Sequence, residues 1–223
     1  MNNIDKKILI ILEGSTDKSI INNIIKKNNL FDGKDIIYFP KEKNKEGIIL
    51  ALDYIKSLKT IPEVTTKKLN KILIIVDADE YPEKRFKNIL KILEEQREEL
   101  KKFDIDKMPE KCGEFVRNKG KVGIGVFLFP DNKVKGSIET LCIKALKHNK
   151  LEKFLSCIEK YIECYKCNCI ENEKELIANK RDKIKFRVYI HTIDPERYQP
   201  CIDKEVNYKD KVVFKDLISF LEG

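Results

Sequence analysis

Two groups of acidic residues follow apolar runs in this chain, at positions where a metal-dependent reaction could take place. Glu13 follows the run Ile8–Leu12, and Asp77 and Asp79 follow the run Ile72–Val76. Long β-branched runs are typical of strands buried on both faces in a parallel sheet, where ligands bind at the carboxyl ends of the strands. Three carboxylates at one sheet edge repel one another unless a cation or protons neutralise them. The cluster therefore predicts a hard divalent cation, Mg²⁺ or Mn²⁺, with oxygen ligands.

The spacing of the acidic residues along the chain indicates which of their side chains point to the same side. Asp77 and Asp79 are two residues apart, so in an extended segment both side chains point the same way while Ala78 points back. Gly14 allows a sharp turn after the first strand. Asp17 falls in the first turn of the helix expected next, and we interpret it as a capping-region acid rather than a ligand.

These segments resemble the Toprim domain of topoisomerases, bacterial primases and the overcoming-lysogenization-defect nucleases, whose pattern is a Glu-Gly turn and a later Asp-x-Asp. The chain is similar in particular to stand-alone archaeal and bacterial Toprim-like proteins. The matching segments, which span roughly residues 7 to 145, are Leu9 to Asp17, Asp77-Ala78-Asp79, Pro130-Asp131-Asn132 and Gly136-Ser137-Ile138-Glu139-Thr140-Leu141. The resemblance implies a Toprim-like, Rossmann-like fold and a metal site more firmly than it implies a reaction.

The resemblance also implies a further metal ligand at Glu139, because some Toprim nucleases carry an acid after the last strand for a second ion. Asp131 is a weaker candidate. In the alternative interpretation Asp131 and Asn132 form a turn, and Glu139 is an acid favoured by the dipole of the next helix.

A cation is needed to stabilise the charge that develops on a phosphate during transfer. Five basic residues crowd the late helix, and some nucleases of this superfamily use a late lysine: Lys180, Arg181, Lys183, Lys185 and Arg187. The favoured interpretation of this group is a solvated helix face. Lys18, next to the first acidic turn, is another nearby cation for which a solvated position is the favoured interpretation.

The elements that position these residues alternate between strands and helices, which indicates βαβ units. Strands are expected at 8–12, 36–39, 71–76 and 122–129, and helices at 17–27, 47–58, 82–102, 137–148, 150–163, 172–190 and 214–222, with an irregular connector at 104–121. We expect an α/β fold with a central parallel sheet of about four strands flanked by helices. Residues 1–149 would form the Toprim-like domain, and residues 150–223 a helical C-terminal extension packed on it.

Composition narrows the class of protein only in part. The chain has 223 residues and a net charge of +8. This charge supports a nucleic-acid partner weakly, because abundant Lys, Asn and Ile are typical of an AT-rich genome. No apolar run is long enough for a membrane span and the amino terminus does not read as a signal peptide, so we expect a cytoplasmic protein without membrane contact.

Four of the seven cysteines cluster late in the chain: Cys157, Cys164, Cys167 and Cys169. Their spacing resembles part of a zinc or iron–sulfur site, but the distant second pair of a zinc ribbon is missing. Buried small hydrophobic side chains are the favoured interpretation.

Three functions from different classes remain. The first is nuclease-like phosphodiester chemistry on DNA or RNA, in which Asp77 and Asp79 hold the metal and Glu13 is a ligand or general base. The second is a non-catalytic module that grips a nucleic-acid phosphate through its metal. The third is a subunit that serves a protein partner such as an ATPase, since the chain itself has no phosphate-binding loop. The oligomeric state stays open.

Overall fold

One mixed sheet forms the centre of the molecule in the computed structural model, which describes residues 7–39, 55, 69–117, 122–146, 151–193, 196 and 198–223. Within these residues the strand order is β2-β1-β3-β5-β4. The strands are β1 (Lys7–Ile11), β2 (Ile36–Phe39), β3 (Leu69–Asp77), β4 (Phe115–Arg117) and β5 (Gly123–Phe129). The first four in the spatial order are parallel to one another, and β4 is antiparallel to β5. The predicted α/β class with about four parallel strands is confirmed.

The fifth strand, β4, lies in the segment predicted to be an irregular connector. It forms where Gly123 of β5 leaves space for the ring of Phe115. A Cβ atom on Gly123 would lie 2.0 Å from Cζ of Phe115, and Phe115 is in register with Gly125. The short strand therefore depends on a packing relation between distant residues, which local pattern does not reveal.

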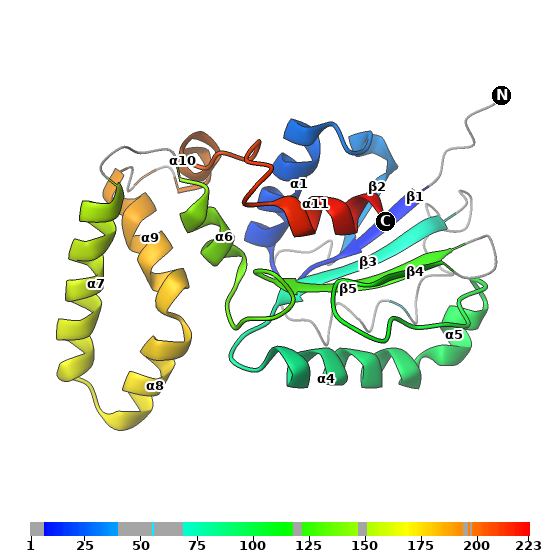
Figure 1. The fold of residues 1–223 in the computed structure, drawn as a ribbon, viewed down its shortest axis with the longest axis horizontal. Helices are drawn as coiled ribbons and strands as arrows, with labels where there is room; N and C mark the ends of the chain where they lie inside the picture. The colour runs from blue at the N-terminus through cyan, green and yellow to red at the C-terminus, as the bar shows by residue number, and fades with distance from the viewer. Residues whose placement is uncertain are drawn as a thin grey trace.

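Helices cover both faces of the sheet (Figure 1). The described helices are α1 (Ser15–Asn28), α4 (Pro82–Glu95), α5 (Arg97–Lys101), α6 (Ile138–Lys144), α7 (Leu151–Cys167), α8 (Glu171–Asn179), α9 (Arg181–Ile193), α10 (Tyr198–Glu205) and α11 (Lys215–Glu222), with a short 3-10 turn at Gly33–Asp35. α4 and α5 lie on one face, and α1 and α11 lie on the other.

Alternate residues of the strands enter two separate cores, as the period-2 geometry of a strand requires. On β1, Ile8 and Ile10 belong to the core under α1 and α11, whereas Leu9 and Ile11 belong to the core under α4. β3 and β5 alternate in the same way. The apolar runs of the sequence are thus continuous because the sheet is covered on both sides.

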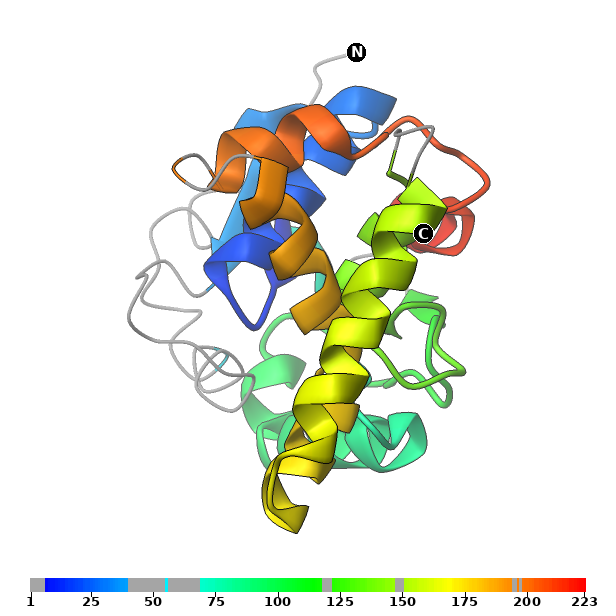
Figure 2. The same ribbon diagram turned by 90° about the vertical axis from the view of Figure 1, so that its left-hand side faces the viewer.

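Three of the helices, α7, α8 and α9, form an arm beyond the carboxyl ends of the parallel strands (Figures 1 and 2). The chain then returns to the sheet, where α11 packs on β5 and the rings of Phe220 and Phe127 lie 5.4 Å apart. The core under α1 includes Phe186 of α9 together with Ile10 of β1 and Phe220. The helices after residue 150 therefore share a core with the sheet.

Two predicted helices are broken in the structure, and one helix was not predicted. The helix expected at 82–102 breaks at Gln96, whose φ of −107° and ψ of 16° end α4, and the helix expected at 172–190 breaks at Lys180. α10 was not predicted, and Pro200 in its first turn explains why, since proline is tolerated only there in a helix. The helix predicted at 47–58 lies outside the described residues except for Ile55, which is buried.

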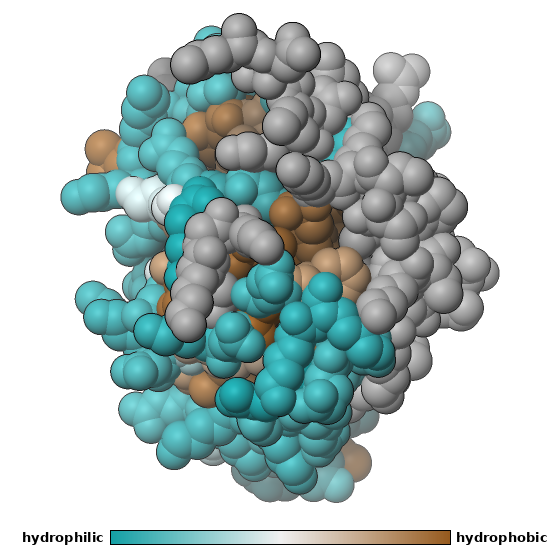
Figure 3. Space-filling view, turned by 90° about the vertical axis from the view of Figure 1, so that its right-hand side faces the viewer, coloured by the Kyte–Doolittle hydropathy of each residue, from teal (hydrophilic) through white to brown (hydrophobic). Residues whose placement is uncertain are grey.

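Figure 3 views the molecule from the side of the amino ends of the strands, opposite the arm. In Figure 3, hydrophilic side chains cover most of the described surface on this side, and hydrophobic side chains gather near its centre. Among the described helices, none has the length and apolar composition required to cross a membrane.

Candidate functional site

A pocket of about 200 Å³ opens at the carboxyl ends of β1 and β3, and we call it the acidic pocket. It is lined by Glu13, Gly14, Ser15, Thr16, Asp17, Asp77, Glu139, Lys183 and Arg187. The lining combines four carboxyl groups with two cationic side chains. These residues come from the ends of two neighbouring parallel strands, the first turns of α1 and α6, and α9, which are far apart in the sequence.

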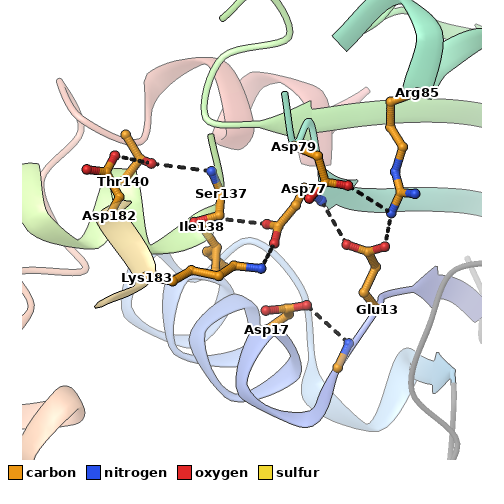
Figure 4. A network of polar contacts seen from close by, with 11 residues as sticks. Glu13, Asp17, Asp77, Asp79, Arg85, Ser137, Ile138, Thr140, Asp182 and Lys183 are labelled. Carbon is orange, nitrogen blue, oxygen red and sulfur yellow. Dashed lines mark hydrogen bonds and ion pairs between the residues drawn. The ribbon is translucent and has the colours of Figure 1, made fainter. Parts of the chain in front are cut away.

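Glu13 and Asp77 lie side by side, as the sequence predicted. The backbone N–H of Asp77 donates to Oε2 of Glu13 at 3.3 Å, and Arg85 donates to Oε1 of Glu13 (Figure 4). The same guanidinium lies 3.7 Å from Oδ2 of Asp79. Because the register of β1 with β3 brings their ends together, the expected convergence of these strand ends is confirmed.

Asp77 is the most buried acid of the site, with 3% of its surface exposed. Its Oδ1 accepts a bond from the backbone N–H of Ile138 at 3.0 Å, and its Oδ2 accepts one from Nζ of Lys183 at 2.5 Å. Burial nevertheless raises the pKa of Asp77, and the ammonium of Lys183 opposes that rise. The fold thus holds a buried carboxylate next to one cation.

Asp17 and Glu139 add two more carboxyl groups to the neighbourhood of Asp77. Burial raises the pKa of Asp17 to about 7, and repulsion from Asp77 and Glu139 contributes to that rise. Burial, followed by repulsion from Asp77, also raises the pKa of Glu139. Glu139 is only 4% exposed, and its Oε2 has no hydrogen-bond partner within the described structure. The acidic pocket therefore has more carboxyl oxygens than its own cations satisfy.

Asp79 takes a different direction from the one predicted. Its φ of +54° ends the extended conformation, and its backbone pairs with Gly136 through N–H···O bonds of 3.2 and 3.0 Å. Its side chain is 60% exposed and reaches toward Arg85 instead of lining the acidic pocket (Figure 4). The expectation that Asp77 and Asp79 share one face is wrong, because i and i+2 share a face only in an extended chain.

Three of the five late basic residues, Arg181, Lys183 and Lys185, form ion pairs, whereas Lys180 and Arg187 are exposed, so the expectation of a solvated helix face is corrected only in part. Lys183 pairs with Asp77, and Arg181 pairs with Glu159 and Glu163 of α7. The pKa of Lys183 is raised: its burial acts to lower it, but the charges of Asp77, Glu139 and Asp17 outweigh that effect. α9 therefore contributes a protonated cation to the acidic pocket.

A second pocket, of about 290 Å³, adjoins the first, and we call it the basic pocket. It is lined by Asp79, Glu80, Lys135, Gly136, Ser137, Ala178, Lys180, Arg181, Asp182 and Lys183. Lys183 belongs to both linings, so the two pockets meet at its side chain. Asp182 is held in place by Thr140, whose Oγ1 donates to it at 2.7 Å.

Other candidates of the sequence have structural roles. Oδ1 of Asp131 accepts bonds from the N–H groups of Lys133 and Val134 at 3.0 Å each, and Oδ1 of Asn132 accepts one from Leu128 at 2.8 Å. These residues form the turn after β5, as the alternative interpretation held. The Nζ atom of Lys18 lies 5.4 Å from the ring centre of Tyr38.

The expectation that the clustered cysteines are buried is wrong. Cys157, Cys164 and Cys167 are exposed free thiols, and Cys169 is partly exposed. The buried stripe of α7 contains Ile158 and Ile162, and the thiols fall outside it because they occupy neighbouring positions around the helix.

Sequence reasoning missed Arg85 and gave Asp17 too small a role. Both stand in the first turn of a helix that follows a strand carrying an acid, so both lie at the sheet edge where the acids gather. Asp17 also accepts a bond from the N–H of Gly14 at 3.1 Å, so its capping role and its place in the pocket coexist. The signal that could have identified them is this first-turn position.

The donor chemistry of the acidic pocket fits a hard divalent cation, because its ligand atoms are carboxyl oxygens and one buried oxygen of Glu139 lacks a partner. As placed, however, no three His, Cys, Asp or Glu side chains in the described part of the chain form a set that could hold a metal ion. Lys183 and Arg85 neutralise Asp77 and Glu13 instead. A metal ion at these oxygens would compete with both cations.

Comparison with known proteins gives a family. Searches of curated proteins and of solved structures find no match for this chain. A family model described as "Protein of unknown function (DUF3226)" matches residues 6–222, which is nearly the whole chain. The chain therefore belongs to the DUF3226 family.

Proposed function

We propose that this protein is a Toprim-like enzyme that hydrolyses phosphodiester bonds in nucleic acid with the aid of Mg²⁺ or Mn²⁺. The observation that carries the proposal is the group of three buried or partly buried carboxyl groups at the sheet edge, Asp17, Asp77 and Glu139, whose pKa values are all raised. Carboxyl groups with perturbed pKa values that share a pocket are typical of functional sites.

The ligands proposed for the ion are Glu13, Asp77, Asp79 and Glu139, with Asp17 nearby. Once bound, the ion would supply an activated water and charge stabilisation for the phosphate. Asp79, which now faces Arg85, is the least direct of these ligands.

The side chains of the protein have separate roles in this proposal. Lys183 lines both pockets and is positively charged. A phosphate bound where the two pockets meet would lie close to its ammonium group. Glu13 lies within reach of the same volume and acts as a ligand or general base. Arg85 holds Glu13 in place and is a positioning residue.

A second candidate has a specific observation in its favour. Glu13 and Asp77 are already neutralised by Arg85 and Lys183, an arrangement that needs no ion. This pairing favours a subunit that depends on a protein partner over both metal-dependent functions, the enzyme and the module that grips a phosphate through its metal.

Cleavage assays on labelled single- and double-stranded DNA and RNA, with Mg²⁺, Mn²⁺ or a chelator, distinguish these functions. We expect cleavage that needs the metal, and a loss of about 100-fold or more in Glu13→Gln with nearly unchanged binding, because polyanion affinity comes mainly from Lys and Arg contacts. Glu95→Gln, at an exposed position of α4, is the matched control and should cleave like the wild type. Wild-type protein that binds but never cleaves would favour the binding module, and protein that does neither would favour the partner-dependent subunit.

A further inference from the structure

Two cations of the basic pocket stand outside the ion pairs of the site. Arg181 and Lys183 line it but are engaged by the acids of α7 and by Asp77. Lys135 and Lys180 are exposed, and neither forms an ion pair with a described residue. Lys135 comes from the turn after β5 and Lys180 from the junction of α8 and α9, so the two ammonium groups approach the pocket from different elements.

The acids of this pocket offset only part of its positive charge, because four cationic and three acidic side chains line it. Asp79 lies near Arg85 and within electrostatic range of Lys180, and Asp182 accepts the bond from Thr140, which leaves its carboxylate charge in place. Glu80 interacts with the neighbouring Tyr81. The lining thus has one more cationic than acidic side chain, which favours an anionic ligand.

An exposed aromatic ring stands next to the basic pocket. Tyr81 is 60% exposed, follows Glu80 of the lining directly, and is within electrostatic range of Glu175 on α8. It therefore lies where the start of α4 approaches the arm. Aromatic rings beside basic grooves bind single-stranded nucleic acids, because an unpaired base stacks on the ring while the cations follow the backbone.

We propose that the basic pocket binds one nucleotide of a single-stranded nucleic acid, with its phosphate between Lys135 and Lys180 and its base stacked on Tyr81. The pocket, at about 290 Å³, is close to the lower limit of about 300 Å³ for small-molecule sites, which suits one nucleotide and not a duplex. The link from this binding to cleavage rests on the proposed function. In that link the next phosphate of the strand would lie at Lys183, beside the carboxyl groups of the acidic pocket.

Binding is measured by fluorescence anisotropy with a short labelled deoxythymidine oligonucleotide and with the corresponding duplex, in a chelator so that no cleavage occurs. We expect the single strand to bind more tightly. Tyr81→Ala should weaken its binding about tenfold, while Tyr81→Phe, which keeps the ring, should bind like the wild type. The double variant Lys135→Ala with Lys180→Ala should bind more weakly and lower the slope of log affinity against log salt by about 1.

Two surface variants serve as controls. Tyr161 on α7 is 59% exposed, almost the same as Tyr81, and lies in the arm outside the basic pocket lining. Lys87 is an exposed lysine of α4. Tyr161→Ala and Lys87→Ala should leave both the affinity and the salt slope unchanged.

Three results would overturn the inference: no binding of the single strand at low salt, equal or tighter binding of the duplex, or equal affinities of Tyr81→Ala and Tyr161→Ala. The proposed function fails separately. Binding that depends on Tyr81 without any metal-dependent cleavage refutes the enzyme and leaves the subsite. Cleavage that is insensitive to Tyr81, Lys135 and Lys180 refutes the subsite and leaves the enzyme.

Discussion

The acidic pocket is a place where individual residues are held at a cost in stability. Asp17 binds its proton more tightly in the folded chain than in the unfolded chain, since its pKa is raised from 3.8 to about 7. Between these two values the folded state binds more protons, so the free energy of unfolding falls as pH rises through this window. Above about pH 7 the full cost is present, and below about pH 4 it is absent.

Asp17→Asn should therefore make the protein more stable at neutral pH and flatten its pH dependence. We expect the variant to gain at least about 1 kcal/mol over the wild type near pH 8, and the gain to shrink as pH falls toward 4. Urea unfolding of both proteins across this range measures the difference.

The control is Asp216→Asn. Asp216 also stands in the first turn of a helix, α11, but it is exposed and remote from the acidic pocket. This variant should lose a few tenths of a kcal/mol from the helix dipole and show no such gain. Equal responses of the two variants to pH would show that Asp17 is an ordinary first-turn acid.

At the scale of elements, the sheet edge keeps its shape through close packing on β5. Gly125 lies under the ring of Phe220 from α11, and a Cβ atom there would be 2.7 Å from that ring and 3.0 Å from the carbonyl oxygen of Glu114. The backbone atom cannot move away as the end of a flexible side chain could. β5 thus accepts α11 on one face only because it lacks a side chain at this position.

Gly125→Ala should destabilise the protein by about 1–3 kcal/mol through overpacking. Gly33→Ala is the matched change, because a Cβ atom there has no neighbour within 4 Å, and it should stay within about 0.5 kcal/mol of the wild type. Chemical denaturation of the three proteins compares them. A harmless Gly125→Ala would mean that α11 does not seat on β5 as described.

The whole molecule is held together at the site by contacts between the arm and the sheet. Lys183 and Asp77 are 106 residues apart, and their ion pair joins α9 to the end of β3. Thr140 and Asp182 join α6 to α9 in the same region. The position of the arm and the charge balance of the acidic pocket are therefore linked.

A double-mutant cycle tests this link. Lys183→Met leaves the charge of Asp77 buried without its ion-pair partner. The substitution should therefore lower the free energy of unfolding by about 1–3 kcal/mol in the wild type and by much less in Asp77→Asn, with a coupling of about 1 kcal/mol or more. Lys185→Met, whose lysine pairs with Glu159 inside the arm, should show no coupling to Asp77. Additive effects of Lys183→Met and Asp77→Asn would refute the link.

The effect of Mg²⁺ or Mn²⁺ on the melting temperatures of the same proteins is a second test. If an ion competes with Lys183 for Asp77, it should raise the melting temperature of the wild type, raise that of Lys183→Met by more, and leave Asp77→Asn unchanged. Thermal melts at millimolar metal measure this. No metal-dependent shift in any of these proteins would count against the proposed cation.

Much of the fold is readable from local pattern. The run Ile72–Val76 is apolar at every position because both of its faces are covered, and Glu13 with Asp77 meet because parallel strands end at one edge. The breaks at Gln96 and Lys180 were missed because the helical periodicity of the sequence continues across them.

The sequence by itself determined the four parallel strands and that Glu13 and Asp77 meet at the sheet edge, since these follow from continuous apolar runs and from adjacency to strand ends. The resemblance added Glu139 as a residue to test. Only the tertiary structure decided that Asp79 turns toward Arg85, that Asp17 enters the pocket, and that Lys183, one of five late basic residues, reaches Asp77. The reason is physical: the direction of a side chain after a strand depends on a single φ angle, and the docking of α9 on the sheet depends on packing between segments about a hundred residues apart.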